Sequence, residues 1–252
     1  MRGSNQRARA IVPAMLLGIA FLSGCQHFHS PASPNGLGTG APLAASKITG
    51  RQAADVQVAM GRMMEKRGDP AQAAAAYLEA LKRDPDRPDA CLRLAMMYDR
   101  AGQFKQAQEL YGKALKGQPG SPDIFCDMGY SLYLQHRWPE AEMNLRQAIA
   151  LAPEHERAHN NLGLVLAHLG RSQDALAEFR RAGCSQADAH INLAFALTLE
   201  NRLPDARTHY ENALAADASS APARQALREL DNLVAKLTPD RQEAMPALAT
   251  EP

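Results

Sequence analysis

The sequence is poor in cysteine, in aromatic side chains and in net charge. Its 252 residues include four cysteines, one tryptophan and 5% aromatic residues, and the formal net charge is +1. Four scattered cysteines without a Cys-x-x-Cys pair exclude a small fold built on a disulfide framework. A nearly neutral chain also gives no electrostatic reason to expect nucleic acid as a partner.

The common catalytic signatures are missing as well: there is no Gly-x-Ser-x-Gly, P-loop or Gly-x-Gly-x-x-Gly motif. One metalloprotease pattern does occur, because His155, Glu156 and His159 match His-Glu-x-x-His, a motif that binds zinc on a helix. Pro153, however, stops the preceding helix, so His155 is expected in a turn, and no third ligand is apparent. We therefore predict a non-enzymatic protein without metal or cofactor. A zinc peptidase at His155, Glu156 and His159 is the remote alternative.

Residues 1–24 are predicted to be an export signal. Three arginines lie within residues 1–9, and the apolar stretch that follows, 10–22, is too short to span a bilayer. The stretch ends in Leu22, Ser23, Gly24 and Cys25, a tetrapeptide that resembles the lipobox of bacterial lipoproteins. The resemblance implies cleavage before Cys25 and acylation of its thiol. The alternative is an ordinary signal peptide with a chance cysteine.

Residues 25–50 are predicted to be the lipidated cysteine and a flexible tether. The segment 26–50 is rich in Pro, Gly, Ser, Thr and Ala and shows no apolar periodicity. Several acyl chains on Cys25 provide the multiple signals that stable membrane attachment requires. The next residue is Gln26, whereas bacterial lipoproteins with Asp at that position tend to stay at the inner membrane. The resemblance therefore implies an outer-membrane lipoprotein that faces the periplasm.

One spacing recurs through the rest of the chain: alanine, then an aromatic or leucine residue four positions later, then alanine three positions further on. The leading alanines are Ala73, Ala107, Ala141, Ala175 and Ala206, at steps of 34, 34, 34 and 31 residues. A fixed period of this size indicates stacked helical repeats. Residues 51–220 therefore divide into five helix–turn–helix units, 54–87, 88–121, 122–155, 156–186 and 187–220. A capping helix at 221–237 and a disordered tail at 238–252 are predicted to follow.

Two further positions support this division. Small residues at the eighth position are expected to let the two helices of a unit lie close together; they are Gly61, Ala95, Gly129, Gly163 and Ala194. Residues that tolerate the left-handed conformation stand between the helices; they are Gly68, Gly102, His136, Gly170 and Asn201. The pattern resembles the tetratricopeptide repeat (TPR). The resemblance implies an all-α, right-handed α-solenoid.

The sequence departs from the TPR pattern in two ways. The usual tryptophan at the fourth position is replaced, for example by His159 and His190. The fourth unit is also three residues short, with Gly183, Cys184 and Ser185 in place of the last turn of its second helix. Cys91 and Cys126 lie on the first helices of adjacent units; they either form a disulfide or are buried as small apolar residues, and burial is favoured. Cys184 is the cysteine to test for exposure.

The first helices of a TPR array line a concave side that commonly receives peptides. The N-terminal units present a mixed-charge wall there, which includes Asp55, Arg62 and Asp99. The later units are more apolar and aromatic, as is usual for an interaction site. The predicted groove residues are Met96, Tyr130, Tyr133, Asn160, Leu164, Ile191 and Phe195. The alternative is that these residues pack on neighbouring helices as core.

The lipobox and the repeats together resemble the TPR lipoproteins of Tad (Flp) and type IV pilus assembly, some of which help a secretin reach or assemble in the outer membrane. The resemblance implies a membrane-anchored scaffold whose groove binds a protein or peptide segment of a secretin or pilus-assembly component. The alternative is an adaptor lipoprotein that recruits cell-wall hydrolases or proteases. The groove lacks the Lys, Arg and Asn cluster that clamps a C-terminal carboxylate, so that class of partner is not expected.

Overall fold

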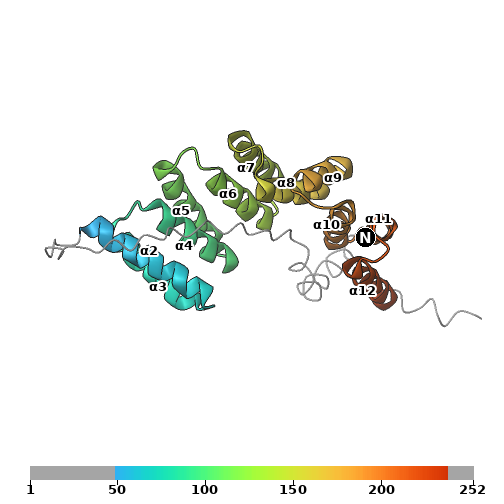
Figure 1. Ribbon diagram of the computed structural model, residues 1–252, viewed down its shortest axis with the longest axis horizontal. Coiled ribbons are helices and arrows are strands. Elements are labelled where there is room, and N and C mark those ends of the chain that lie inside the picture. Colours follow the sequence, from blue (N-terminus) through green and yellow to red (C-terminus); the bar gives the residue numbers. More distant parts are fainter. Residues whose placement is uncertain (1–48, 238–252) are drawn as a thin grey trace, which may run out of the picture. The chain divides into compact units, whose positions relative to one another are not determined.

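The computed structural model describes residues 49–237. The predicted export signal, lipobox and most of the tether, together with the predicted tail, lie outside the described residues. Within 49–237 the chain forms eleven helices and no strand (Figure 1). The helices are α2 (Gly50–Lys66), α3 (Pro70–Arg83), α4 (Pro88–Arg100), α5 (Phe104–Gly117), α6 (Pro122–Leu134), α7 (Trp138–Leu151), α8 (Glu156–His168), α9 (Ser172–Arg181), α10 (Gln186–Leu199), α11 (Leu203–Ala216) and α12 (Ala221–Leu237).

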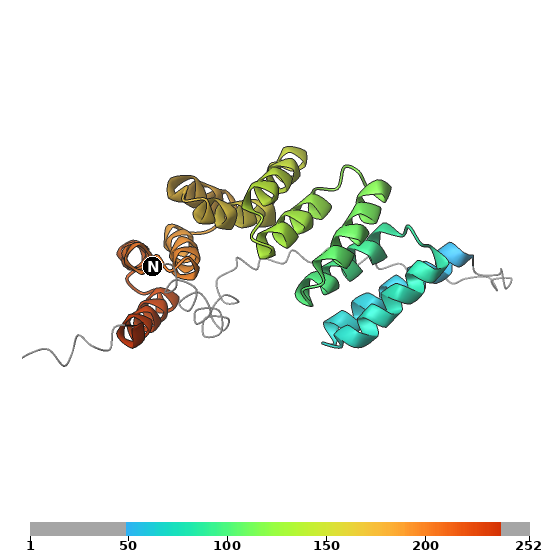
Figure 2. The same ribbon diagram turned by 180° about the vertical axis from the view of Figure 1, so that it is seen from behind.

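The chain divides into two compact units, whose described parts are residues 49–161 (the first unit) and 162–237 (the second unit). In the first unit α2 packs against α3, α4 against α5 and α6 against α7. In the second unit α10 packs against α11, and α12 contacts both of them. The paired helices lie side by side in both views (Figure 1, Figure 2). The prediction of an all-α TPR array that ends in a capping helix is confirmed.

The helix ends follow from local side-chain chemistry. Thr49 and Gln52 form a capping box at the start of α2, and the Asp69 side chain accepts the Gln72 backbone N–H at the start of α3. Every predicted turn residue has a positive φ: Gly68 at 75°, Gly102 at 71°, His136 at 59°, Gly170 at 77° and Asn201 at 58°. The prediction of left-handed turn residues is therefore confirmed.

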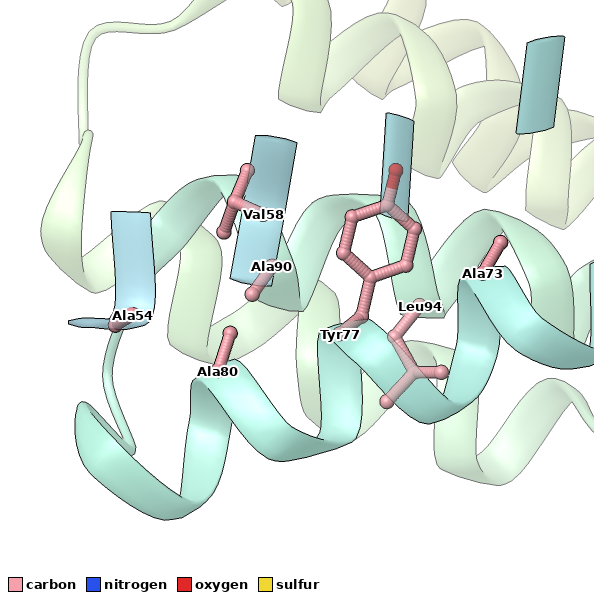
Figure 3. Close-up of a cluster of buried hydrophobic side chains, with 7 residues drawn as sticks. All are labelled: Ala54, Val58, Ala73, Tyr77, Ala80, Ala90 and Leu94. Atoms are coloured by element: carbon pink, nitrogen blue, oxygen red, sulfur yellow. The ribbon is translucent and has the colours of Figure 1, made fainter. Parts of the chain in front are cut away.

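The eighth position of a repeat is where the two helices of a pair come closest. A Cβ atom added to Gly61 on α2 would lie 2.5 Å from the Tyr77 ring on α3, and one added to Gly163 on α8 would lie 2.6 Å from the Phe179 ring on α9. Tyr77 is fully buried, in a cluster to which Leu94 of α4 also belongs (Figure 3). Small residues recur at this position because a large side chain of the partner helix fills the space beside them.

The structure also shows that the second helix of the fourth repeat is short. Helix α9 has 10 residues, whereas α3, α5, α7 and α11 each have 14. It ends at Arg181. Two residues later Gly183 has a φ of 82°, and the Cys184 backbone N–H donates to the Phe179 carbonyl over 3.1 Å. Among residues 49–237, no helix has the length and apolarity needed to cross a bilayer.

Candidate functional site

The first unit holds four of the predicted groove residues. Tyr130 is 42% exposed, and every other phenylalanine, tyrosine and tryptophan among residues 49–237 is half-buried or buried. Met96, Tyr133 and Asn160 are half-buried. Met96 packs against the apolar cluster of the second repeat. Binding by these residues stays a prediction, but only Tyr130 offers a large aromatic surface to a partner.

The second unit holds the other three predicted groove residues. Leu164 on α8 and Phe195 on α10 are half-buried. Ile191 is only 6% exposed, so its side chain contributes mainly to the core of this unit. The predicted groove residues therefore fall on two surfaces, one in each unit. Tyr130, in the first unit, is the most exposed of them.

Tyr130 begins a cluster of aromatic rings that continues from α6 to α7. Its ring stacks on that of Tyr133, with centroids 5.8 Å apart and planes 15° apart, because residues i and i+3 share a helix face. The Tyr133 ring lies 5.2 Å from that of Trp138, the first residue of α7. We call Tyr130, Tyr133 and Trp138 the aromatic cluster. The sequence prediction missed Trp138, although a lone tryptophan two residues after the turn at His136 was a usable signal.

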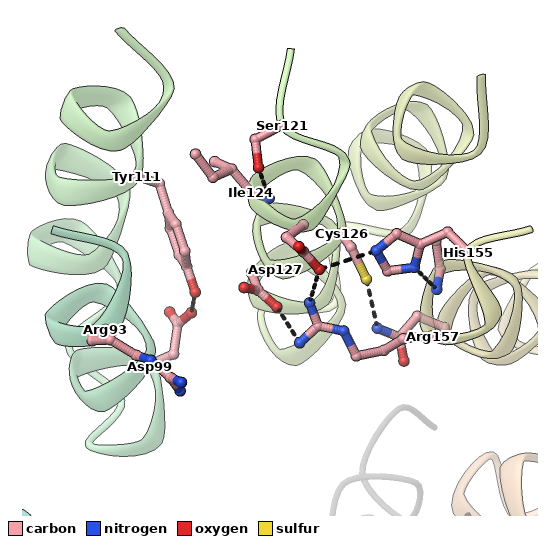
Figure 4. Close-up of polar contacts among 12 residues, drawn as sticks. Arg93, Asp99, Tyr111, Ser121, Ile124, Cys126, Asp127, His155 and Arg157 are labelled. Carbon is pink, nitrogen blue, oxygen red and sulfur yellow. Dashed lines mark hydrogen bonds and ion pairs between the residues drawn. The ribbon is translucent and has the colours of Figure 1, made fainter. Parts of the chain in front are cut away.

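A buried carboxylate joins α6, which carries Tyr130 and Tyr133, to α4 and α5. Asp99 on α4 accepts a hydrogen bond from the Tyr111 hydroxyl on α5 over 2.7 Å (Figure 4). It also accepts one from the Ser131 hydroxyl on α6 over 2.7 Å. Asp99 was expected on an exposed charged wall, but it is 7% exposed, and burial raises the pKa of its carboxyl. The two donated hydrogen bonds satisfy this buried group. They fix α6, and with it Tyr130, relative to α4 and α5.

A second polar network joins α6 to the start of α8. Arg157 lies 2.9 Å from Asp127 and 3.0 Å from Asp123, and the His155 Nε2 atom lies 3.2 Å from Asp123 (Figure 4). Asp127 is 8% exposed, and burial raises its pKa to about 6 even though Arg157 opposes the shift. Hydrogen bonding to His155 and the charge of Arg157 hold the pKa of Asp123 below its usual value. Charged groups thus join the third repeat to the first residues of the fourth.

Substitution Arg157→Gln is expected to lower the free energy of unfolding by about 1–2 kcal/mol at pH 7.5, because it leaves the Asp127 carboxylate buried without its cation. The expected loss is modest because the Arg157 side chain is 47% exposed, so that solvent screens the pair. The loss should shrink at pH 5. The folded-state pKa of Asp127 is above its ordinary 3.8, so Asp127 becomes neutral as pH falls through about 6. Urea unfolding at both pH values measures this difference. Arg146→Gln, at an exposed pair with Glu142, is the control, and an equal loss at both pH values would contradict the account.

The His-Glu-x-x-His match does not form a zinc site in the structure. His155 precedes α8, its Nδ1 atom accepts the backbone N–H of Ala158, and its Nε2 atom faces Asp123. His159 is buried, and its Nε2 atom lies 2.8 Å from the Pro153 carbonyl oxygen. Residues 49–237 contain no group of three or more His, Cys, Asp or Glu side chains suited to a metal ion.

The three described cysteines are buried and free, so the interpretation of Cys91 and Cys126 as buried residues is confirmed. Burial raises the pKa of Cys91 to about 11 and that of Cys126 to about 12. Such thiols are poor nucleophiles at neutral pH. Cys126 also accepts a hydrogen bond from Asn161 of α8 over 3.6 Å, which joins adjacent repeats. Cys184 is 9% exposed.

Three solved structures show similar helical arrays. PilF of Pseudomonas aeruginosa is 26% identical, with a TM-score of 0.54, and the match covers 77% of this chain and 96% of PilF. PilW, described as a widely conserved type IV pilus biogenesis factor, is 24% identical over 76% of this chain and 96% of its own, with a TM-score of 0.57. YrrB, described as a TPR protein with an unusual peptide-binding site, is 22% identical over 69% and 92%, with a TM-score of 0.52. The likeness to PilW and YrrB establishes a shared fold.

A comparison with curated protein sequences found no match. A family model does match: the TPR model described as the cilia and flagella-associated protein 70 C-terminal domain aligns with residues 33–250. This range includes all eleven described helices. The TPR fold typically serves as a non-catalytic, protein-binding scaffold. The chain therefore belongs to the TPR family of the cilia and flagella-associated protein 70 C-terminal domain.

Proposed function

We propose that this TPR-type protein-interaction scaffold is anchored to the bacterial outer membrane through Cys25, faces the periplasm and binds a component of a pilus or secretion assembly. The observation that carries the proposal is the aromatic cluster, in which Tyr130 is 42% exposed while it stacks on Tyr133. Accessible tyrosine and tryptophan side chains on a rigid support are typical of the residues that dominate binding energy at protein interfaces.

The surroundings of the cluster favour binding of a protein segment. Tyr130 and Tyr133 project from α6, which Asp99 fixes to α4 and α5 through Tyr111 and Ser131. A surface held in this way loses little conformational entropy when a partner docks. An extended or helical peptide with apolar side chains suits such a surface, because aromatic rings offer a large contact area with few rotatable bonds.

The envelope location is proposed from the sequence. Leu22, Ser23, Gly24 and Cys25 match each position of a lipobox, and they lie outside the described residues. The likeness to PilF of Pseudomonas aeruginosa, at 26% identity over 96% of that chain, supports the assignment to pilus assembly. A secretin or pilus-assembly component is therefore the proposed partner.

Capture of the partner should depend on Tyr130. In crosslinked co-purification from native envelopes, Tyr130→Ala is expected to lower recovery of secretin or pilus subunits about tenfold or more, as for an aromatic hot spot. Helicity and thermal unfolding should change little, because Tyr130 is substantially exposed. Met143→Ala, at a 66% exposed apolar residue of α7, is the matched control and should recover the partner like wild type. If both variants recover the same proteins as wild type, the aromatic cluster is not the site. If cell-wall hydrolases or proteases replace the pilus components, the adaptor role is correct instead.

Anchoring has its own test. Cys25→Ser is expected to leave the protein without acyl chains and outside the outer-membrane fraction, because the thiol is the acylated group. Fatty-acid labelling and membrane fractionation measure both effects. A Cys25→Ser chain that still incorporates labelled fatty acid would contradict lipidation at this residue.

A further inference from the structure

The two terminal helices of the described array differ in the surface that they expose. The exposed residues of α12 are mostly polar or charged, such as Arg224, Arg228 and Asp231, as expected of a helix that caps a repeat array. The first helix, α2, instead exposes three large apolar side chains. Val56 is 52% exposed, and the values for Met60 and Met63 are 41% and 42%.

These three side chains form one stripe. Val56, Met60 and Met63 are spaced i, i+4 and i+7, so they lie on one face of α2. The residues of α2 that are buried against the array, Ala54 and Gly61 among them, lie on the other side. The stripe therefore lies opposite the buried face of α2. Met63, at its end, also borders a hollow that Arg87 and Asp89 line.

The exposed charged residues of α2 are mostly basic: Arg51, Arg62 and Lys66 are exposed, and Asp55 is the one exposed acidic residue. Lys66 and Arg67 are exposed beside the last residue of the stripe. The two acidic residues of α2 have basic partners at α4: Asp55 pairs with Arg87, the residue before α4, and Glu65 lies 3.6 Å from Arg93 of α4.

Arg62 also lies on this helix, and it pairs with Asp89 over 3.2 Å. Asp55, Glu65 and Asp89 are thus each paired with a cation. Lys66 and Arg67 leave a positive charge next to the apolar stripe.

We propose that the outer face of α2 binds the surface of a membrane that contains anionic phospholipid. An apolar stripe flanked by basic residues is the pattern of a helix that lies in the plane of the interface, with its apolar side chains among the acyl chains and its cations at the headgroup phosphates. A second copy of the chain is a less suitable occupant of this face. Three side chains on one helix provide far less contact area than the roughly 800 Å² that each partner buries in a stable interface. Two copies would also bring like charges together.

This role goes beyond partner capture by the aromatic cluster and does not require acylation of Cys25. Binding through one short stripe is weak by itself, since stable attachment takes more than one signal. With an anchored Cys25, the second contact would hold the first repeat against the membrane. The proposed partner-binding residue Tyr130 lies two repeats further along the chain.

A local fluorescence probe tests the proposal in the full chain. In a Cys25→Ser background, Met60→Cys and, separately, Met143→Cys are labelled with the environment-sensitive fluorophore NBD; Met143 of α7 is the matched exposed control. The described native cysteines are buried, and the background without an added cysteine measures any labelling of them. Vesicles of phosphatidylcholine, with or without phosphatidylglycerol, are then added.

The proposal predicts a severalfold rise and a blue shift of emission from position 60 with the phosphatidylglycerol vesicles, a smaller change with phosphatidylcholine alone, and no change at position 143. Adding Lys66→Glu with Arg67→Glu should abolish most of the rise. Equal responses at positions 60 and 143 would overturn the proposal. So would a rise at position 60 that needs no vesicles and grows with protein concentration, which would identify a second copy as the occupant. Because the probe is local, neither result depends on whether Cys25 anchors the chain or Tyr130 binds a partner.

Discussion

Gly129→Ala is expected to lower the free energy of unfolding by about 1–3 kcal/mol, although alanine is the better helix former. The added Cβ would lie 2.6 Å from Leu145 Cγ and 3.3 Å from the Ala141 carbonyl oxygen. Helices α6 and α7 must therefore move apart or Leu145 must leave its position. Urea unfolding followed by circular dichroism measures the loss.

Two further variants separate this steric effect from helix propensity. Gly112→Ala on α5 should raise stability by about 0.5–1 kcal/mol, because nothing lies within 4 Å of the added Cβ. Leu145→Ala alone should cost about 2–5 kcal/mol as a fully buried leucine. In that background Gly129→Ala should be nearly neutral or stabilising, since the new methyl group enters vacated space. A Gly129→Ala penalty that is unchanged in the Leu145→Ala background would show that close helix approach is not its cause.

Asp99→Ala is expected to cost about 2–4 kcal/mol, because the buried hydroxyls of Tyr111 and Ser131 both lose their acceptor. Asp99→Asn retains a carbonyl oxygen and should cost less, which distinguishes hydrogen bonding from packing. Loss of these two hydrogen bonds in Asp99→Ala should also make α6 less rigid and therefore weaken partner capture through Tyr130.

The control for Asp99 is Glu140→Ala, which removes a carboxylate that pairs with Arg137 on the surface and should change stability little. Thermal unfolding and the co-purification assay measure the two consequences of Asp99→Ala together. Full stability in Asp99→Ala would contradict the role of this carboxylate as the link between α4, α5 and α6.

The helical array could be predicted from sequence because its determinants are local. His136 and Asn201 could be identified as turn residues although they are not glycines, because they occupy the same repeat position as Gly68 and Gly102. The eighth-position small residues were likewise predicted from spacing alone, and the contact at Gly61 gives the steric reason.

The candidate site was predicted less completely, because it depends on contacts between repeats. The spacing along the first helices predicted that Asp99 lies on the exposed wall. In the structure the hydroxyls of Tyr111 and Ser131 donate hydrogen bonds to Asp99 and stabilise it in a buried position. Trp138 begins a second helix, so a search confined to first helices passed over it. Ile191 has the spacing of a groove residue, yet its side chain is buried in the second unit. Spacing defines the face of a helix, whereas the neighbouring repeat determines how much of that face stays accessible.

The central claim is that a partner binds the aromatic cluster, and site-specific photo-crosslinking in cells tests it most directly. A benzoyl-phenylalanine at position 130 is compared with the same residue at position 143, where the native methionine is 66% exposed. The account predicts an adduct with a secretin or pilus-assembly subunit at position 130 and none at position 143. The absence of an adduct at position 130 in cells that assemble the complex, or the same adducts at both positions, would contradict it.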